Sequence, residues 1–116
     1  MDICFEGIGQ MVATFATKED LASGMAVTLA GNGEVSLGKK DDPLCGITVG
    51  AARGGAVAVQ IGGVAKVGYA DGATVNLGRQ ELACDGKGKV NADGGDGVSC
   101  LVLAVDKDEK TVVVRL

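Results

Sequence analysis

Cysteines and carboxylates are the first candidates for nucleophilic, acid–base or metal chemistry in this chain, because the sequence contains no histidine. Histidine is the usual general base and the commonest metal ligand of proteins. Its absence excludes Ser-His-Asp and Cys-His catalytic arrangements. The cysteines Cys4, Cys45, Cys84 and Cys100 form no C-x-x-C pair, the spacing that zinc sites use. We therefore expect no catalytic site, no cofactor and no zinc centre, and a protein that is not an enzyme.

The four cysteines are expected to be reduced. An even cysteine count can indicate disulfides, but that pattern is typical of small secreted domains. The opening residues, Met-Asp-Ile-Cys-Phe-Glu, lack the basic and apolar regions of a secretory signal peptide. We interpret Cys45 and Cys100 as small apolar core residues, a common environment for free cysteine.

Two glycine-rich segments carry residue types that bind phosphate or calcium elsewhere. Residues 85–89, Asp-Gly-Lys-Gly-Lys, lack the spacing of a phosphate-binding loop, so a hairpin turn is expected. Residues 91–97 place Asp93 and Asp96 among glycines but lack the closing glutamate of an EF-hand. Asp-Gly runs usually form plain turns, so a turn is expected there too, with cation binding as the alternative.

Lys66 raises a second functional hypothesis. Biotinyl and lipoyl carrier domains are small β-barrels with an internal repeat and a modified lysine on a hairpin. Lys66 lies instead within the strand-like run Gly-Val-Ala-Lys-Val, without acidic or methionine neighbours. A lysine on the solvent-facing side of a strand is therefore favoured. A soluble ligand-binding or carrier module is kept as the alternative function.

Composition predicts an all-β fold. The chain has 116 residues, the size of one domain, and 47% are hydrophobic, yet only three are aromatic: two phenylalanines and one tyrosine. The core must be built from small aliphatic side chains, which suit a pleated sheet. Twenty glycines against one proline indicate many tight turns between short strands.

Charge and hydropathy argue against two classes of partner. The net charge of −4 repels phosphate backbones, and few aromatic rings are present to stack on bases. We therefore expect no nucleic-acid partner. No apolar run approaches the roughly 18 residues of a membrane span, so no membrane partner is expected either.

An internal repeat organises the chain. Residues 33–61 align with residues 88–116 at a constant offset and without a gap. Identical residues in this alignment include the pairs Gly33/Gly88, Val35/Val90, Asp41/Asp96, Cys45/Cys100, Val57/Val112 and Val59/Val114. Residues 24–29 align with residues 72–77 at a smaller offset, which a longer loop over residues 78–87 explains.

This repeat predicts the domain organisation. Residues 1–16 form an N-terminal arm and a first strand, and residues 17–116 form a single β domain. Within that domain, repeat one covers about residues 24–61 and repeat two about residues 72–116. The expected architecture is a compact antiparallel barrel or sandwich of short strands.

The hydrophobic pattern locates individual elements. Strands with period-2 alternation are predicted around residues 27–29 and 75–77. Two hairpins are predicted, residues 44–49 with 56–61 and residues 99–105 with 111–116, and residues 64–69 form a further strand. The best helix candidate is a short one at residues 17–23, with Thr17 as its N-cap.

The N-terminus divides into two parts. Residues 11–16 fit the first strand of the barrel. Residues 1–9 carry the apolar side chains Ile3, Phe5 and Ile8 on a glycine-punctuated segment, as expected of an arm that docks on a neighbouring protein. We predict Ile3, Phe5 and Ile8 as partner-binding residues.

With this pattern, the chain resembles the small β-rich head-decoration, or capsid-stabilising, proteins of tailed phages and prophages. The segments that carry the resemblance are residues 21–27 (LASGMAV), 55–67 (GAVAVQIGGVAKV), 97–104 (GVSCLVLA) and 112–116 (VVVRL). The resemblance implies a non-enzymatic structural protein that binds the major capsid protein on the outer surface of the virion. It also implies a homo-oligomer, often a trimer, an arm that pairs with capsid strands, and assembly in the bacterial host cytoplasm.

Overall fold

The computed structural model describes residues 10–92 and 97–116, which form ten β-strands and no helix. The strands are β1 (Met11–Ala16), β2 (Ala26–Gly31), β3 (Glu34–Ser36), β4 (Gly46–Thr48), β5 (Ala56–Gly62), β6 (Val64–Gly68), β7 (Gly78–Cys84), β8 (Val90–Asn91), β9 (Val98–Asp106) and β10 (Thr111–Arg115). The predicted all-β fold class is confirmed. No helix in the described part of the chain is long and apolar enough to cross a membrane.

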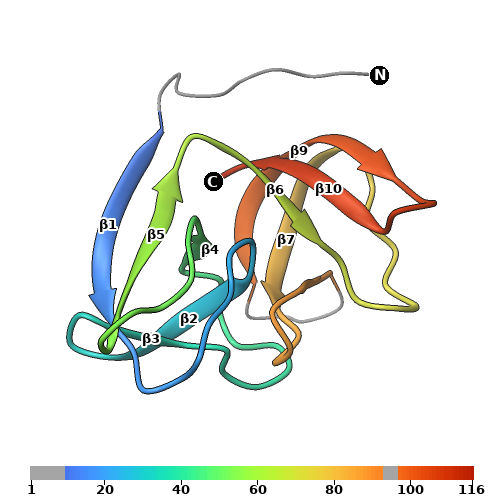
Figure 1. Ribbon diagram of the computed structural model, residues 1–116. Helices are drawn as coiled ribbons and strands as arrows, with labels where there is room; N and C mark the ends of the chain where they lie inside the picture. Colours follow the sequence, from blue (N-terminus) through green and yellow to red (C-terminus); the bar gives the residue numbers. More distant parts are fainter. Residues whose placement is uncertain (1–9, 93–96) are drawn as a thin grey trace.

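The ten strands form two units with the same strand order. The first is a closed barrel, β1-β3-β2-β4-β5, and the second is a sheet, β6-β10-β9-β7-β8 (Figure 1). Because β1 also pairs with β5, the closed barrel can be read in the other direction as β1-β5-β4-β2-β3, and adding five to each of these strand numbers gives the order of the sheet. Parallel pairing of Ala16 with Glu34 closes the barrel, and one parallel bridge joins Tyr69 to Val90 in the second unit. The predicted duplication thus has a counterpart in topology, although it stays a prediction.

Both predicted hairpins are present. Strands β4 and β5 pair antiparallel, with Ile47 opposite Gln60. Strands β9 and β10 pair antiparallel around a turn in which Lys110 adopts a positive φ of 54°. Strand β1 occupies the residues predicted for the first strand and pairs along its length with β5.

The barrel and the sheet share part of their core. One cluster fills the barrel around Val27, Val35 and Val59. The larger cluster belongs mainly to the sheet but includes Ala26, Leu44 and Ile47 from the barrel half of the chain. Its buried members are Ala26, Leu44, Ile47, Ala65, Val67, Tyr69, Val75, Leu82, Cys84, Val90, Cys100, Val102, Val112 and Val114. Separating the units would expose these apolar side chains to water, so burial holds them together.

Backbone pairing reinforces this junction. Pro43 forms an antiparallel bridge with Ala83 of β7, and the Asp41 N–H donates to the carbonyl oxygen of Cys84 at 2.8 Å. Asp41 adopts a positive φ of 72°, and its Oδ1 accepts a hydrogen bond from the side-chain amide of Asn91 at 3.0 Å. The hydrogen bond from Asn91 of the second unit therefore stabilises Asp41 in a backbone conformation that is unfavourable for a residue other than glycine.

The predicted helix at residues 17–23 is wrong, because this segment consists of bends and a turn. Thr17 does act locally as an N-cap would, since its Oγ1 accepts a hydrogen bond from the Glu19 N–H at 3.1 Å. The carboxylate of Glu19, however, accepts a hydrogen bond from the Leu37 N–H at 2.6 Å, which ties the segment to the residues after β3. Bonds to other segments thus replace those of a helix.

The strand predicted around residues 75–77 and the loop predicted at residues 78–87 are also wrong. Residues 73–77 have no regular structure, and strand β7 begins at Gly78. This strand pairs with β9 from Gly78 opposite Val102 to Leu82 opposite Val98. The sheet therefore takes the strand between β9 and β8 from the segment assigned to a loop.

Candidate interaction surface

Burial keeps the described thiols protonated at neutral pH. It raises the pKa of Cys84 to about 12, and it also raises the pKa values of Cys45 and Cys100. A thiol reacts as a nucleophile only in its thiolate form. These three cysteines are free; Cys84 and Cys100 are buried, and Cys45 is half-buried against the barrel core. Cys45 and Cys100 thus act as the small apolar residues predicted, Cys84 has the same environment without having been predicted, and Cys4 lies outside the described residues.

The turn predicted at residues 85–89 is present. The Asp85 Oδ1 accepts hydrogen bonds from the backbone N–H groups of Lys87 (2.7 Å) and Lys89 (3.0 Å). The carboxylate is thus used to hold the β7–β8 connection. No group of three potential metal ligands occurs among the described residues. Asp93 and Asp96 lie outside those residues, so the turn and the alternative cation site both stay predictions.

Lys66 is an exposed residue in the middle of β6, as predicted. It pairs in register with Val113 of β10, which in turn pairs with Ala104 of β9. Side chains at paired positions point to the same face of a sheet. Lys66 therefore stands on the outer face of the second unit rather than on a hairpin turn.

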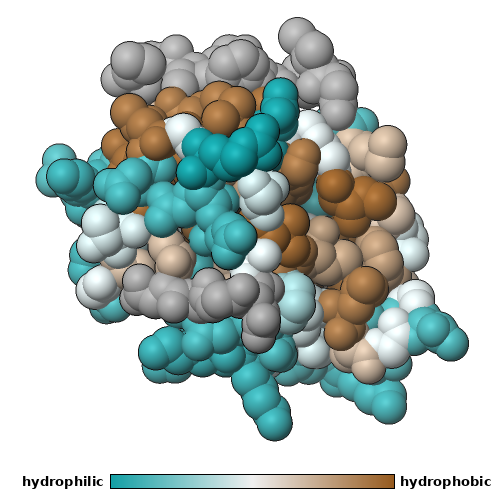
Figure 2. Space-filling model, turned by 180° about the vertical axis from the view of Figure 1, so that it is seen from behind, coloured by the Kyte–Doolittle hydropathy of each residue, from teal (hydrophilic) through white to brown (hydrophobic). Residues whose placement is uncertain are grey.

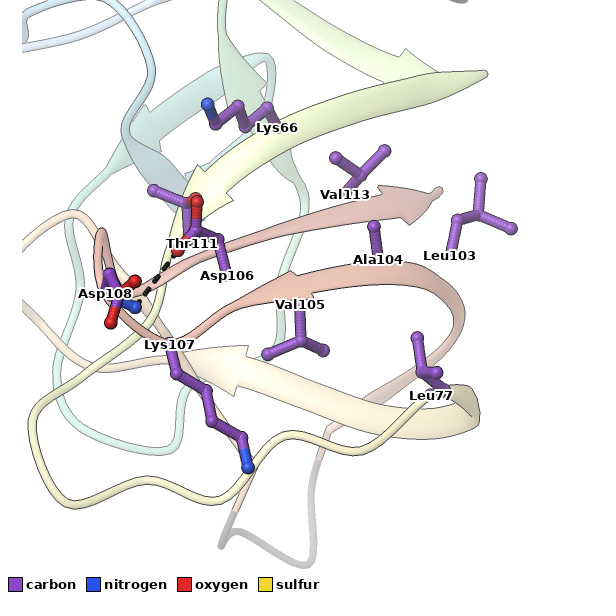
Figure 3. Close-up of a pocket in the computed structure, with 10 residues that line it drawn as sticks. All are labelled: Lys66, Leu77, Leu103, Ala104, Val105, Asp106, Lys107, Asp108, Thr111 and Val113. Atoms are coloured by element: carbon purple, nitrogen blue, oxygen red, sulfur yellow. Dashed lines mark hydrogen bonds between the residues drawn. The ribbon is translucent and has the colours of Figure 1, made fainter. Parts of the chain in front are cut away.

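This outer face and the neighbouring sheet edge form an open groove with a volume of about 700 Å³. Figure 3 shows β6, β10 and β9 side by side, with Lys66, Val113 and Ala104 across them and Leu77 near the start of β7. The residues lining the groove are Lys66, Leu77, Leu103, Ala104, Val105, Asp106, Lys107, Asp108, Thr111 and Val113. Half of these lining residues are aliphatic, and four are charged.

Some charged side chains of the groove have hydrogen-bond partners and others have none among the described residues. In the part of the chain that the structure describes, the side-chain ammonium groups of Lys66 and Lys107 have neither a hydrogen bond nor an ion pair. The Asp106 carboxylate already accepts hydrogen bonds from two N–H groups of the β9–β10 turn. Outside the groove lining, Lys110 pairs with Asp71, which lowers the pKa of Asp71 and raises that of Lys110. Two cationic side chains are therefore available to a ligand.

The groove also contains a free strand edge. The β7–β9 ladder stops at the pair Gly78–Val102, whereas β9 continues to Asp106 alongside β10. Along this last part of β9, the structure describes no strand on the edge away from β10. Leu77, at the point where the ladder stops, is 68% exposed. Backbone N–H and C=O groups on a free edge can pair with an added strand.

Strand β1 is a second exposed apolar element. Met11 is 61% exposed and Val12 is 46% exposed, and no residue of β1 is buried. In its counterpart by strand order, β6, the inward residues Ala65 and Val67 are buried. Among the described residues, the other large exposed apolar side chains are Leu29, Val49, Leu77 and Val98. Figure 2 shows apolar side chains gathered in patches on the rear face, between hydrophilic ones.

The predicted partner-binding residues Ile3, Phe5 and Ile8 lie outside the described residues, so that prediction is not tested. Sequence reasoning missed the groove. The available signal was Leu77, which ends the predicted strand of residues 75–77 and precedes Gly78. A leucine next to a glycine of positive φ, here 95°, also fits a strand boundary.

Comparison with solved structures finds a similar fold in a chain of a viral particle. A chain in the structure described as "The capsid of Myoviridae Phage XM1" superposes on this protein with a TM-score of 0.65. The match covers 96% of this chain and 85% of the other, at 16% sequence identity. No protein-family model matches the sequence, and no curated protein matches it. The protein is therefore similar in fold to a chain of a phage capsid.

Proposed function

We propose that this protein is a phage or prophage structural protein that decorates and stabilises the head. In this proposal it binds the major capsid protein on the outer surface of the virion and has no catalytic role. The observation that carries the proposal is the fold likeness to a chain of a phage capsid, which extends over 96% of this protein. At 16% identity the likeness concerns the fold, so the surfaces supply the rest of the argument.

Two surface features favour a role in assembly. The exposed apolar strand β1 and the groove beside β9 lie in different units, the barrel and the sheet. Exposed apolar patches and free strand edges commonly mark protein interfaces. We propose that the protein associates with itself as a trimer and that residues 1–9, with Ile3, Phe5 and Ile8, contact the capsid.

Co-sedimentation with capsids that lack this protein tests the proposal. Light scattering should give three times the chain mass of 11.5 kDa, and the protein should sediment with expanded heads. Deleting residues 1–9 should abolish sedimentation and leave the oligomer intact. The variant Leu29→Ser, which changes an exposed residue of the barrel, is the control and should still sediment. A monomer that binds equally well with and without residues 1–9 would contradict the proposal.

A further inference from the structure

We propose that Asn32 is a site of spontaneous deamidation, and that its isoaspartate product breaks the contact that closes the barrel between β1 and β3. This inference goes beyond the proposed function, because it concerns the covalent chemistry of the barrel and does not depend on capsid binding. It rests on the residue that follows Asn32, the exposure of the turn, and the hydrogen bond that the turn makes with β1.

The reacting groups lie in the hairpin between β2 and β3. Asn32 and Gly33 form the whole connection between these strands. Both residues are exposed, and a Cβ atom at Gly33 would meet nothing within 4 Å. In the part of the chain that the structure describes, neither the Asn32 side chain nor the Gly33 N–H has a hydrogen-bond partner. The carboxamide and the backbone nitrogen after it are therefore both free to react.

The reaction joins these two groups and uses water as its only co-reactant. The Gly33 nitrogen forms a bond to Cγ of Asn32, the bond between Cγ and Nδ2 breaks, and ammonia leaves with the proton that the Gly33 nitrogen gives up. Water then opens the resulting cyclic imide at either of its carbonyl carbons. Opening at Cγ gives aspartate, whereas opening at the backbone carbonyl carbon gives isoaspartate, in which the main chain runs through Cγ.

The glycine after Asn32 favours this reaction. The attacking nitrogen must approach Cγ closely, and a side chain on its own residue would hinder that approach, whereas glycine has no Cβ and the widest backbone freedom. The other asparagines of the chain, Asn76 and Asn91, lack this feature. Asn76 is exposed but precedes a leucine. Asn91 is 3% exposed, and its side-chain amide donates a hydrogen bond to Asp41. We therefore expect deamidation at Asn32 first.

The same turn lies at the closure of the barrel. The Ala16 N–H donates a hydrogen bond to the carbonyl oxygen of Gly33 at 2.8 Å, and Ala16 with Glu34 is the single pair that joins β1 to β3 on the described ladders. An isoaspartate at position 32 lengthens the main chain just before Gly33 and so displaces this carbonyl. Strand β1 keeps its pairing with β5, so the barrel opens along one seam without unfolding.

Peptide mapping of the folded protein tests the assignment. Cleavage after lysine and arginine places the three asparagines in separate peptides, residues 19–39, 67–79 and 90–107. After storage at mildly alkaline pH, the peptide of residues 19–39 should exchange NH2 for OH at least about tenfold faster than the other two, because only its asparagine precedes glycine. The net charge of the protein should change from −4 to −5 in step with this exchange.

Two variants make the assignment specific. Asn32→Gln should abolish the change of charge, because the longer side chain forms a cyclic imide far more slowly. Asn76→Gln is the matched control at an exposed asparagine and should leave the rate unchanged. Deamidation of Asn76 as fast as that of Asn32 would overturn the proposal, and so would a reaction at Asn32 that occurs only in urea.

Hydrogen exchange measured by NMR tests the effect on the barrel. The comparison protein is freshly prepared Asn32→Asp, which carries the charge of the product on an unchanged main chain. The Ala16 N–H should exchange at least about tenfold faster in the isoaspartate form than in this variant, because its acceptor is displaced. The Cys45 N–H, which donates to Val27 in the same barrel, should exchange equally in both proteins. Equal exchange at Ala16 would refute the opening of the seam.

Discussion

Gly46 offers the sharpest test of the barrel, because a single methyl group there has no space. Gly46 is a buried residue of β4, opposite Val27 of β2. A Cβ atom at this position would lie 2.3 Å from the carbonyl oxygen of Gln60 and 2.7 Å from Cγ1 of Val59. Both distances are far below ordinary van der Waals contact.

The size of the effect follows from what would have to move. The carbonyl of Gln60 belongs to the backbone of β5, which is paired with β4 at Ile47, and Val59 is fully buried. Relief therefore requires separating two paired strands, not rotating a side chain. Overpacking a core usually costs about 1–3 kcal/mol, and a backbone clash belongs at the upper end. We expect Gly46→Ala to lower the free energy of unfolding by about 3 kcal/mol and Tm by about 10 °C.

Urea unfolding followed by far-ultraviolet circular dichroism measures this change. The matched control is Gly50→Ala, because a Cβ atom at Gly50 meets nothing within 4 Å and the backbone there is not left-handed. The control should stay within about 0.5 kcal/mol of the wild type. A Gly46→Ala protein that is less than about 1 kcal/mol destabilised would refute the close approach of β4 to β5.

Two further predictions concern the junction and the buried thiol. Asp41→Ala should destabilise the protein by about 2 kcal/mol, because it removes the hydrogen bond from Asn91 at a positive φ. Asp41→Gly should cost about 1 kcal/mol less, since glycine adopts that φ freely; equal unfolding midpoints would contradict this. Cys84 keeps its proton to a pKa of about 12, while the unfolded chain loses it near 9.0. Stability should therefore fall as pH rises from 9 to 12, by up to about 1.4 kcal/mol per unit from this group, and Cys84→Ala should flatten that slope in urea titrations.

Elements were predicted correctly where the local sequence pattern, in hydrophobic periodicity and turn residues, matches the structure that the folded protein adopts there. The hairpins β4–β5 and β9–β10 combine aliphatic runs with short polar turns, so periodicity and turn chemistry indicate the same structure. Strand β1 was located for the same reason. Cys100 was predicted as a small apolar core residue, and it is buried.

The elements that were missed depend on partners distant in sequence. Strand β7 reads Gly-Arg-Gln-Glu-Leu-Ala-Cys, and its first half looks like a loop because Arg79 and Glu81 face solvent. Only its pairing with β9 makes it a strand. Conversely, Val75 and Leu77 are apolar at alternating positions, as in a strand. The segment that contains them is irregular, however, with Val75 buried and Leu77 exposed. Residues 78–84, predicted as a loop, form strand β7, and residues 75–77, predicted as a strand, are irregular. The groove depends on this arrangement, which the local sequence pattern does not reveal.

The shared core bears on the proposed role in capsid binding. Because Ala26, Leu44 and Ile47 pack into the core of the second sheet, the barrel and the sheet hold fixed positions relative to each other. The exposed surface of β1 and the groove beside β9 are then also fixed in relative position. Contacts made by linked sites reinforce one another only when geometry lets both engage at once. A rigid pair of surfaces therefore suits binding to a regular lattice, where the spacing between partners is set in advance.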